Sequence, residues 1–516
     1  MTRPVLSRAL WWLAVLLVVA GALAFRLPRL DQRPMHGDEA NQAVRAGILL
    51  DSGTYHYDPN DHHGPSLYFA ALPFCRATAK TFADTTEWNY RLVPVAFSLL
   101  TLALMAGLGV RRGVAGCFTN RGGLFVALLL TAVSPAMVYY SRFFIQETMF
   151  VTFLTGMLLC AVRYTQRQPD ENAGGWAVGF GVFAGLSAAT KETVVLSLAA
   201  AAVAAVAACG FGRLWRGIRW QDALLAVGAA ALVAVLLFSS FLTYPRGVYD
   251  AVFSTIETYF YRATAVPEHQ HPWNFYLKTI FWFKYGKGPV WSEAGVLLPA
   301  AVAVCWAFFS ARGRWVRFLA VYTLALTALY SLIPYKTPWC ALSFLHGYIL
   351  LAGVGVGVVI DWLWRFPKAG RMAGVAAVAV LVGALAWRHY GQACRACFKL
   401  PADPRNPYVY AHTGTDAMNL VAEIERVAGQ ADGHDTLIAL AVPTPDTWPL
   451  PWYLRKYRNV GYWTNVADIT QGVAPVIVIA AADQGDVADE RFGEGKRASF
   501  FGIRPGVLLN VFVPEK

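Results

Sequence analysis

Long apolar runs separated by short polar stretches make up most of this chain. Each run is close to the roughly 20 residues that a helix needs to cross the hydrocarbon of a bilayer. The runs lie near residues 9–25, 91–110, 122–140, 145–162, 176–190, 194–210, 222–242, 294–310, 317–333, 341–360 and 372–387. The pattern predicts about eleven membrane-spanning helices. The first run lacks a small-residue cleavage site, so we interpret it as a retained anchor.

Two shorter amphipathic stretches follow the first run. Residues 65–80 are too short to span a bilayer, and we expect them to form a helix on the membrane surface. A second surface helix is predicted to start at about Asp38, because small or apolar residues then recur at helical spacing. These residues are Ala40, Ala43, Val44, Gly47 and Ile48.

The pattern changes after the last apolar run. Residues 415–429 have helical periodicity, and three short segments, "TLIALAV", "PVIVIAAA" and "VLLNVFV", are typical of buried strands. The fold class that we predict is therefore a mainly α, polytopic membrane protein with a carboxy-terminal α/β domain. We place the membrane domain at residues 1–388 and the α/β domain at 389–516.

Composition and charge agree with this division. Of the 516 residues, 56% are hydrophobic and 15% are charged, whereas soluble domains carry nearer a quarter charged residues. The net charge of +12 comes from basic residues at the amino terminus and in alternate loops, so it follows the positive-inside rule and does not indicate nucleic acid as a partner. We therefore expect a cytoplasmic amino terminus and an extracytoplasmic α/β domain, in the inner membrane of a prokaryote.

Six of the eight cysteines are scattered, as small apolar core residues are. Cys394 and Cys397 form a CxxC pair just after the last span. A local disulfide and two free thiols are both open interpretations, and a zinc site would need two more ligands.

Ionisable side chains lie at the predicted outer ends of several spans. Such groups are costly next to a bilayer and are usually functional. They are His36, Asp38 and Glu39 after the first span, His62 and His63 before the surface helix, and Arg142, Glu147, Lys191, His269, His271 and Lys336 in later loops. Their common side and depth predict one outward-facing site. Each also has a structural alternative, such as a charge that complements a helix dipole or a lysine that reaches the interface.

At these residues the chain resembles the membrane-embedded GT-C glycosyltransferases, which include protein O-mannosyltransferases and the aminoarabinose transferase of lipid A. It is most similar to the family of flippase-activity-associated proteins. The resemblance covers roughly residues 9–360 and depends on the Asp-Glu pair at 38–39, the Gly-Pro-x-x-Tyr segment at 64–68 and "TKE" at 190–192.

The resemblance implies an enzyme that moves a sugar from a polyprenyl-phosphate donor to a glycan, lipid or protein acceptor, with inversion. Asp38 inherits the role of catalytic base, since a fixed carboxylate suits deprotonation of an acceptor hydroxyl. Glu39 and Glu147 would orient that base or bind sugar hydroxyls. The leaving phosphate needs cations, for which Arg142, Lys191 and Lys336 are candidates.

Two departures from the family pattern affect metal and phosphate binding. This chain has "HHGP" where relatives often place a carboxylate or lysine before the proline, and Glu147 stands where an aspartate is common. A divalent metal held by His63, His269 and His271 is an alternative, because imidazole suits zinc. The sequence establishes no cofactor, and hydrogen-bonding histidines remain the simpler interpretation.

Two other classes of function stay open. A component of a lipid-linked glycan flippase would bury charges near the bilayer midplane, often in inverted repeats, and the sequence shows no such repeat. A non-catalytic scaffold that only holds a lipid-linked glycan would keep the fold and the basic groups without needing Asp38.

Overall fold

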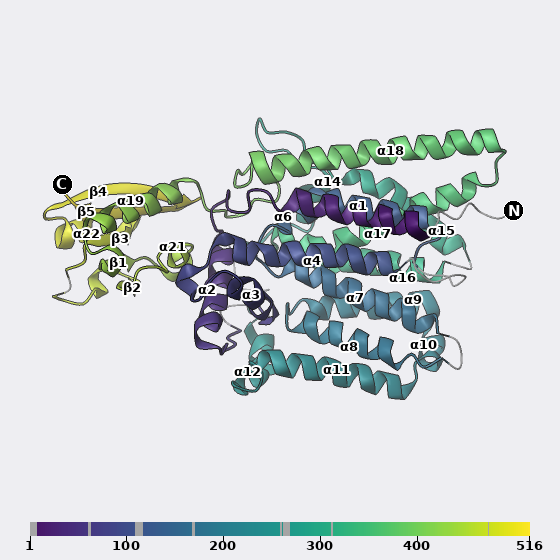
Figure 1. Ribbon diagram of the computed structural model, residues 1–516, viewed down its shortest axis with the longest axis horizontal. Helices are drawn as coiled ribbons and strands as arrows, with labels where there is room; N and C mark the ends of the chain where they lie inside the picture. The colour runs from purple at the N-terminus through teal and green to yellow at the C-terminus, as the bar shows by residue number, and fades with distance from the viewer. Residues whose placement is uncertain are drawn as a thin grey trace.

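The computed structural model describes residues 8–59, 63–108, 117–167, 171–258, 261, 269–310, 313–472 and 474–515. A bundle of long helices forms the larger part, and a small α/β unit lies at one end of it (Figure 1). Helix α10 (Phe211–Gly217) lies at the opposite end (Figure 1). Helix α10, which carries Arg213, is therefore remote from the α/β unit, and the membrane topology stays a prediction.

Every predicted apolar run coincides with helix. The corresponding elements are α1 (Arg8–Arg26), α4 (Glu87–Gly107), α5 (Arg121–Val133) with α6 (Pro135–Tyr140), α7 (Glu147–Thr165), α8 (Gly174–Ala188), α9 (Val194–Cys209), α11 (Trp220–Phe238), α15 (Leu297–Phe309), α16 (Arg314–Leu332), α17 (Leu342–Leu363) and α18 (Lys368–Cys394). Within the described ranges, seven helices are long and apolar enough to cross a membrane by length and composition, and four shorter apolar helices accompany them. The prediction of a polytopic, mainly helical protein is confirmed.

Small residues let neighbouring helices approach closely. A Cβ atom at Gly181 of α8 would lie 2.1 Å from the carbonyl oxygen of Ala226 in α11, so only glycine fits there. Helices in lipid usually associate through small residues that allow close packing. Lipid tails are as apolar as the helix surfaces, so no hydrophobic effect drives the helices together.

Two amphipathic helices lie at the end of the bundle that faces the α/β unit, namely α2 (Gly37–Ser52) and α3 (Ser66–Arg76) (Figure 1). Both were predicted, and α2 begins one residue before Asp38. The hydroxyl of Tyr68 donates to Gln42 Oε1 at 2.5 Å and joins the two helices. The chain also has the short helices α10, α12 (Arg246–Tyr249), α14 (Phe275–Phe281), α20 (Thr444–Thr447) and α21 (Leu450–Tyr453).

The α/β unit is built on a five-stranded mixed sheet of order β2-β1-β3-β5-β4. Its strands are β1 (Ile438–Ala441), β2 (Val460–Trp463), β3 (Ile477–Ala481), β4 (Lys496–Arg504) and β5 (Val507–Pro514). Helix α19 (Asp416–Gln430) packs on the face that carries Ile438 and Ile477, and α22 (Gly485–Phe492) packs on the face that carries Ala439 and Val478. The three predicted strands are the buried β1, β3 and β5. The sequence pattern missed β2 and β4, which are the partly exposed edge strands.

The segment between α18 and α19 returns to the bundle. The Tyr408 hydroxyl donates to Glu293 Oε1 at 2.9 Å, and the Tyr140 hydroxyl donates to the carbonyl of Tyr408 at 3.0 Å. Helix α18 continues through the proposed boundary at residue 388, and the division into two domains there stays a prediction. The structure has no disulfide bond between Cys394 and Cys397.

Candidate active site

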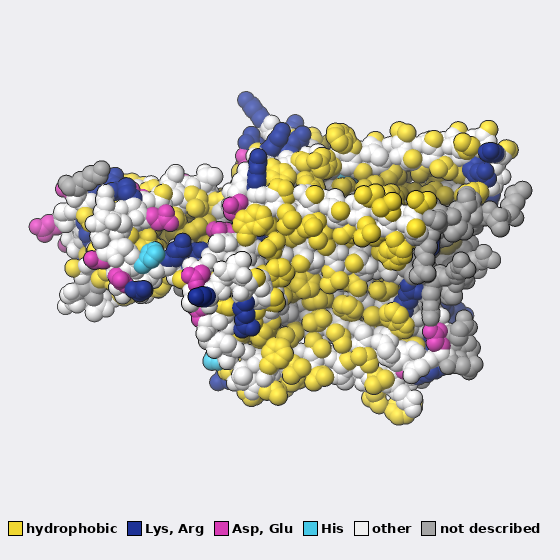
Figure 2. All heavy atoms as spheres, viewed as in Figure 1, with side chains coloured by type: hydrophobic (Ala, Val, Ile, Leu, Met, Phe, Trp, Pro, Cys, Tyr) yellow, Lys and Arg dark blue, Asp and Glu magenta, His cyan; other side chains and the backbone are white. Residues whose placement is uncertain are grey.

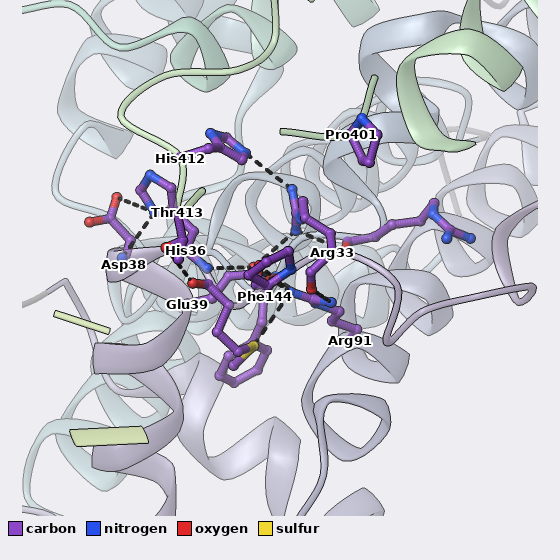
Figure 3. Close-up of polar contacts among 12 residues, drawn as sticks. Arg33, His36, Asp38, Glu39, Arg91, Phe144, Pro401, His412 and Thr413 are labelled. Carbon is purple, nitrogen blue, oxygen red and sulfur yellow. Dashed lines mark hydrogen bonds and ion pairs between the residues drawn. The ribbon is translucent and has the colours of Figure 1, made fainter. Parts of the chain in front are cut away.

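Glu39 is the centre of a buried charge network at the start of α2. Its carboxylate is fully buried and accepts hydrogen bonds from Arg33 Nη2 at 2.9 Å and from Arg91 Nε and Nη2 at 2.9 and 2.8 Å. The backbone amides of His36 and Phe144 add two more, at 3.1 and 2.9 Å (Figure 3). Both carboxylate oxygens are therefore occupied, and Glu39 joins the first loop, α4 and the segment before α7.

The arginines decide the charge state of Glu39. Burial by itself raises the pKa of a carboxyl group, but the nearby Arg33 and Arg91 guanidinium groups outweigh it and lower the pKa of Glu39 to about 2. Arg91 also donates to the carbonyls of Leu30 and Arg33 at 2.5 and 2.8 Å, so the loop after α1 wraps around this guanidinium. Glu39 is thus ionised, saturated and rigid, as suits a residue that positions its neighbours.

Asp38 is the opposite of its neighbour. Its side chain is 51% exposed and points away from the arginines that Glu39 faces (Figure 3). Over the described ranges, the only ion-pair neighbour of its carboxylate is the imidazole of His36, with Nδ1 and Oδ2 3.9 Å apart. The Asp-Glu pair therefore presents one buried, committed carboxylate and one accessible carboxylate on a fixed helix end.

His36 holds the start of α2 in place. Its Nδ1 accepts a hydrogen bond from the amide of Asp38 at 2.9 Å, and its Nε2 lies 2.9 Å from the carbonyl oxygen of Tyr410. This pattern assigns the proton to Nε2. Burial lowers the pKa of His36, so the ring is neutral near pH 7 and leaves the charge of Asp38 uncompensated.

A strap from the segment before α19, residues 408–413, covers this network. His412 Nε2 lies 2.8 Å from the Tyr139 hydroxyl and 3.2 Å from Arg33 Nη1. The Thr413 hydroxyl donates to the carbonyl of Met35 at 2.7 Å (Figure 3). The strap thus ties the α/β unit directly to the loop that carries Asp38.

Glu147 and Lys191 form a buried ion pair. Lys191 Nζ also lies 3.5 Å from Cys340 Sγ, while the second carboxylate oxygen of Glu147 is buried without a hydrogen-bond partner in the described chain. The pair is neutral as a whole. Lys191 can therefore bind a phosphate only by sharing its charge with Glu147.

Arg142 and Lys336 are held mainly by backbone carbonyls. Arg142 donates to Arg26, to Pro28 at 2.7 Å and to Arg29 at 3.0 Å, and Lys336 donates to the carbonyls of Ile333 and, at 3.0 Å, His271. With Arg33 and Arg91, Arg142 also lines a small pocket. Both cations stabilise loops at this end of the bundle, and a role in substrate binding stays a prediction.

The predicted histidines pair with other groups. His63 Nδ1 lies 2.8 Å from Glu192 Oε2, and the Tyr410 hydroxyl lies 2.7 Å from His269 Nδ1 and 3.2 Å from His271 Nε2. His62 lies outside the described residues. In the described part of the chain no three His, Cys, Asp or Glu side chains gather closely enough to hold a metal ion, so His63, His269 and His271 do not form a ligand set there.

The three sequence marks of the GT-C resemblance meet at this end of the bundle. Gly64 abuts the "TKE" turn so closely that a Cβ atom would lie 2.3 Å from the carbonyl oxygen of Ala189. The amide of Ser66 donates to the same carbonyl at 2.9 Å, and its hydroxyl lies 2.7 Å from that of Thr190. Tyr68 continues the contact to α2, as described above. The three motifs are therefore in contact with one another at this end of the bundle, and one shared site for the predicted residues stays a prediction.

Sequence reasoning missed the residues that complete the network, namely Arg33, Arg91, Tyr139, Tyr410 and His412. Arg91 stands near the start of a span, where an ionisable group is a recognisable signal. Tyr410 and His412 carried no such signal, because their segment was assigned to the second domain.

We expect Tyr410→Phe to loosen the strap. The change leaves His269 and His271 without their hydroxyl partner, and a lost hydrogen bond between partly buried groups costs about 1 kcal/mol. Thermal unfolding and hydrogen exchange of the amides at 408–413 measure the effect. Tyr462→Phe, which alters a half-exposed tyrosine of β2, is the control. Equal exchange in both variants would show that the Tyr410 hydroxyl does not stabilise the strap.

Comparison with known proteins shows which proteins this fold is similar to. The family described as dolichyl-phosphate-mannose-protein mannosyltransferase matches residues 69–244. ArnT from Cupriavidus metallidurans, in a crystal structure with bound undecaprenyl phosphate, is similar with a TM-score of 0.66 and 15% identity over 96% of this chain and 97% of that chain. The Archaeoglobus fulgidus oligosaccharyltransferase, in a structure tethered to an acceptor peptide, is similar with a TM-score of 0.57 and 10% identity over 99% of this chain and 74% of that one.

No curated protein sequence matches the chain. The structural similarities nevertheless extend over both the bundle and the α/β unit, because they cover nearly the whole chain. The protein has the GT-C fold of membrane-embedded glycosyltransferases that use polyprenyl-phosphate-linked sugars, as its motifs predict.

Proposed function

We propose that the protein is a membrane glycosyltransferase that moves a sugar from a polyprenyl-phosphate donor to an acceptor hydroxyl, with Asp38 as the base. The observation that carries the proposal is the different environment of the two carboxylates in the Asp-Glu pair. Glu39 is locked by Arg33 and Arg91, while the neighbouring Asp38 presents an accessible carboxylate with no strong cation on it. The family match and the fold supply the class of reaction.

The reaction is a single displacement. Asp38 removes the proton from the acceptor hydroxyl while its oxygen attacks the anomeric carbon of the sugar. The bond from that carbon to the phosphate oxygen breaks, the electron pair leaves with the lipid phosphate, and the anomeric configuration inverts. General base catalysis of this kind contributes roughly 10²–10⁴-fold to the rate.

The bundle offers a place for an apolar chain. A pocket with mostly apolar walls lies between α7, α9, α16 and α17. Its lining residues Ser197 and Ser343 lie about one to two helical turns below Lys191 and Cys340. A prenyl chain in this pocket would bring its phosphate to the level of Lys191, and the ArnT structure with undecaprenyl phosphate supports a ligand of this class.

The proposal places the site outside the cytoplasm, because α2 and the α/β unit lie at the end of the bundle opposite α10, whose basic residues predict the cytoplasmic side (Figure 1). Membrane vesicles of both orientations, given radiolabelled polyprenyl-phosphate sugars, test function and topology together. We expect transfer to an extracted acceptor pool only in vesicles whose α/β unit faces the medium. Transfer in the reverse orientation alone would contradict the topology. Binding of a lipid-linked glycan without any transfer would favour the scaffold.

A further inference from the structure

A strip of positive charge lies where α18 leaves the bundle. Helix α18 runs along the edge of the bundle (Figure 1) and exposes most of its apolar surface. Arg388 lies near its end, and Arg395 and Lys399 lie in the π-helical turn Arg395–Lys399 that follows. The spacing of 388, 392, 395 and 399 places these positions on one helix face.

A hairpin packs against this face. Phe283 and Trp291 exchange two backbone hydrogen bonds of 3.0 and 2.9 Å, and the turn between them carries Lys284 and Lys287, both exposed. Gln392 Oε1 accepts a hydrogen bond from the amide of Ser292 at 3.2 Å and joins the hairpin to α18.

The hairpin is firmly anchored. Trp291 is fully buried, and its Nε1 donates to the carbonyl of Arg405 at 2.7 Å. The guanidinium of Arg395 lies 5.8 Å from the centre of the Trp291 ring, within the range of a cation–π contact. Lys284 and Lys287 therefore stand on a rigid base next to Arg395.

These residues form what we call the basic patch, which consists of Lys284, Lys287, Arg388, Arg395 and Lys399. The sequence contains no Asp or Glu in 282–292 or in 388–402. Across the described residues none of the five forms an ion pair with a carboxylate, and the nearby Asp403 is paired with Arg405 at 2.6 Å. Figure 2 shows Lys and Arg side chains gathered above the bundle at the end nearest the α/β unit.

Aromatic residues mark the depth of the patch. Trp282, Tyr285 and Trp387 are 66, 58 and 75% exposed beside it. Exposed Trp and Tyr at the end of a membrane-spanning helix are typical of the headgroup level of a bilayer. The aromatic residues alone would serve as anchors at that depth, so they do not account for five uncompensated cations.

We propose that the basic patch binds the phosphate group of an acidic phospholipid in the leaflet at the α/β end of the bundle. Clustered Lys and Arg at headgroup depth attract anionic lipids, and the absence of carboxylates leaves this charge free for a phosphate. The positive-inside rule accounts for Arg365, Lys368 and Arg371 at the other end of α18. It does not account for the cations of the basic patch, because the rule predicts an excess of positive charge on one side of the membrane only. The lipid would hold the outer end of α18 and the hairpin together.

Native mass spectrometry of the purified full-length protein, titrated with phosphatidylglycerol or phosphatidylcholine in detergent, tests the proposal. We expect the wild type to retain phosphatidylglycerol in preference by roughly tenfold or more. Lys284→Gln with Lys287→Gln should remove most of this preference, because each cation at the membrane surface contributes about fivefold. Both side chains are exposed, so the fold should be unaffected.

Two controls make the result specific. Lys284→Arg with Lys287→Arg keeps the charge and should keep the preference. Lys456→Gln with Arg458→Gln removes two exposed cations from the α/β unit and should leave the preference unchanged. No sugar donor is present, so the result does not depend on the proposed glycosyl transfer.

Two outcomes would overturn the proposal. The first is a failure of lipid selectivity to depend on the patch. The wild type would then retain phosphatidylglycerol and phosphatidylcholine equally, or the Lys284→Gln, Lys287→Gln variant would show an unaltered preference. The other is tighter binding of heparin, a soluble acidic glycan, than of phosphatidylglycerol, with loss of heparin binding in the same variant. That result would identify the patch as a glycan surface.

Discussion

Asp38→Asn should abolish nearly all sugar transfer while the protein still folds and binds its donor. The asparagine keeps the shape of the side chain and its place at the start of α2 but has no basic oxygen for the acceptor proton. Loss of a general base costs roughly 10²–10⁴-fold in turnover. The measurement is the rate of transfer of labelled sugar from a polyprenyl-phosphate donor, together with donor affinity and the temperature of unfolding.

Asp31→Asn is the matched control for this experiment. Asp31 is an exposed carboxylate in the same loop, seven residues before Asp38. Its replacement changes the net charge in the same way and should leave turnover unaltered. Asp38→Glu retains a carboxylate and should recover part of the activity. Full turnover in Asp38→Asn would reduce Asp38 to a residue that starts a helix.

Glu39→Gln should affect stability far more than chemistry. The neutral amide leaves Arg33 and Arg91 buried without their shared counter-charge, and removing one partner from a buried ion pair costs about 3–5 kcal/mol. We expect a lower unfolding temperature and a lower yield of folded protein. Any protein that remains folded should keep a measurable part of its turnover. Thermal unfolding in detergent, followed by transfer assays on the folded fraction, separates the two effects.

The same network has a predictable dependence on pH. The pKa of Glu39 is about 2 in the folded protein, below its ordinary value of 4.5. Its contribution to stability is therefore complete above about pH 4.5 and is lost as the pH falls from there toward 2. Glu39→Gln should lose this part of the acid sensitivity. If the variant and the wild type lose stability in parallel between pH 5 and 3, the ionised Glu39 does not support the fold.

The sequence by itself determined the elements of the fold. Apolar runs predict helices because a bilayer offers no partner for backbone polar groups, and every predicted run became a helix. The buried strands β1, β3 and β5 were predicted for a similar reason, since continuous apolar segments can only lie inside. The edge strands β2 and β4 were missed because their partly exposed residues carry no such pattern.

The sequence also identified the Asp-Glu pair, but only the tertiary structure separated its two members. Both carboxylates stand at the first turn of one helix, so local pattern treats them alike. The difference arises because Arg33 and Arg91 meet on one side of that helix, and Arg91 is 52 residues away from Glu39 along the chain. The strap residues Tyr410 and His412 are further still, more than 370 residues beyond His36 and Arg33. Such partners are chosen by packing between distant segments, which the order of residues along one segment does not encode.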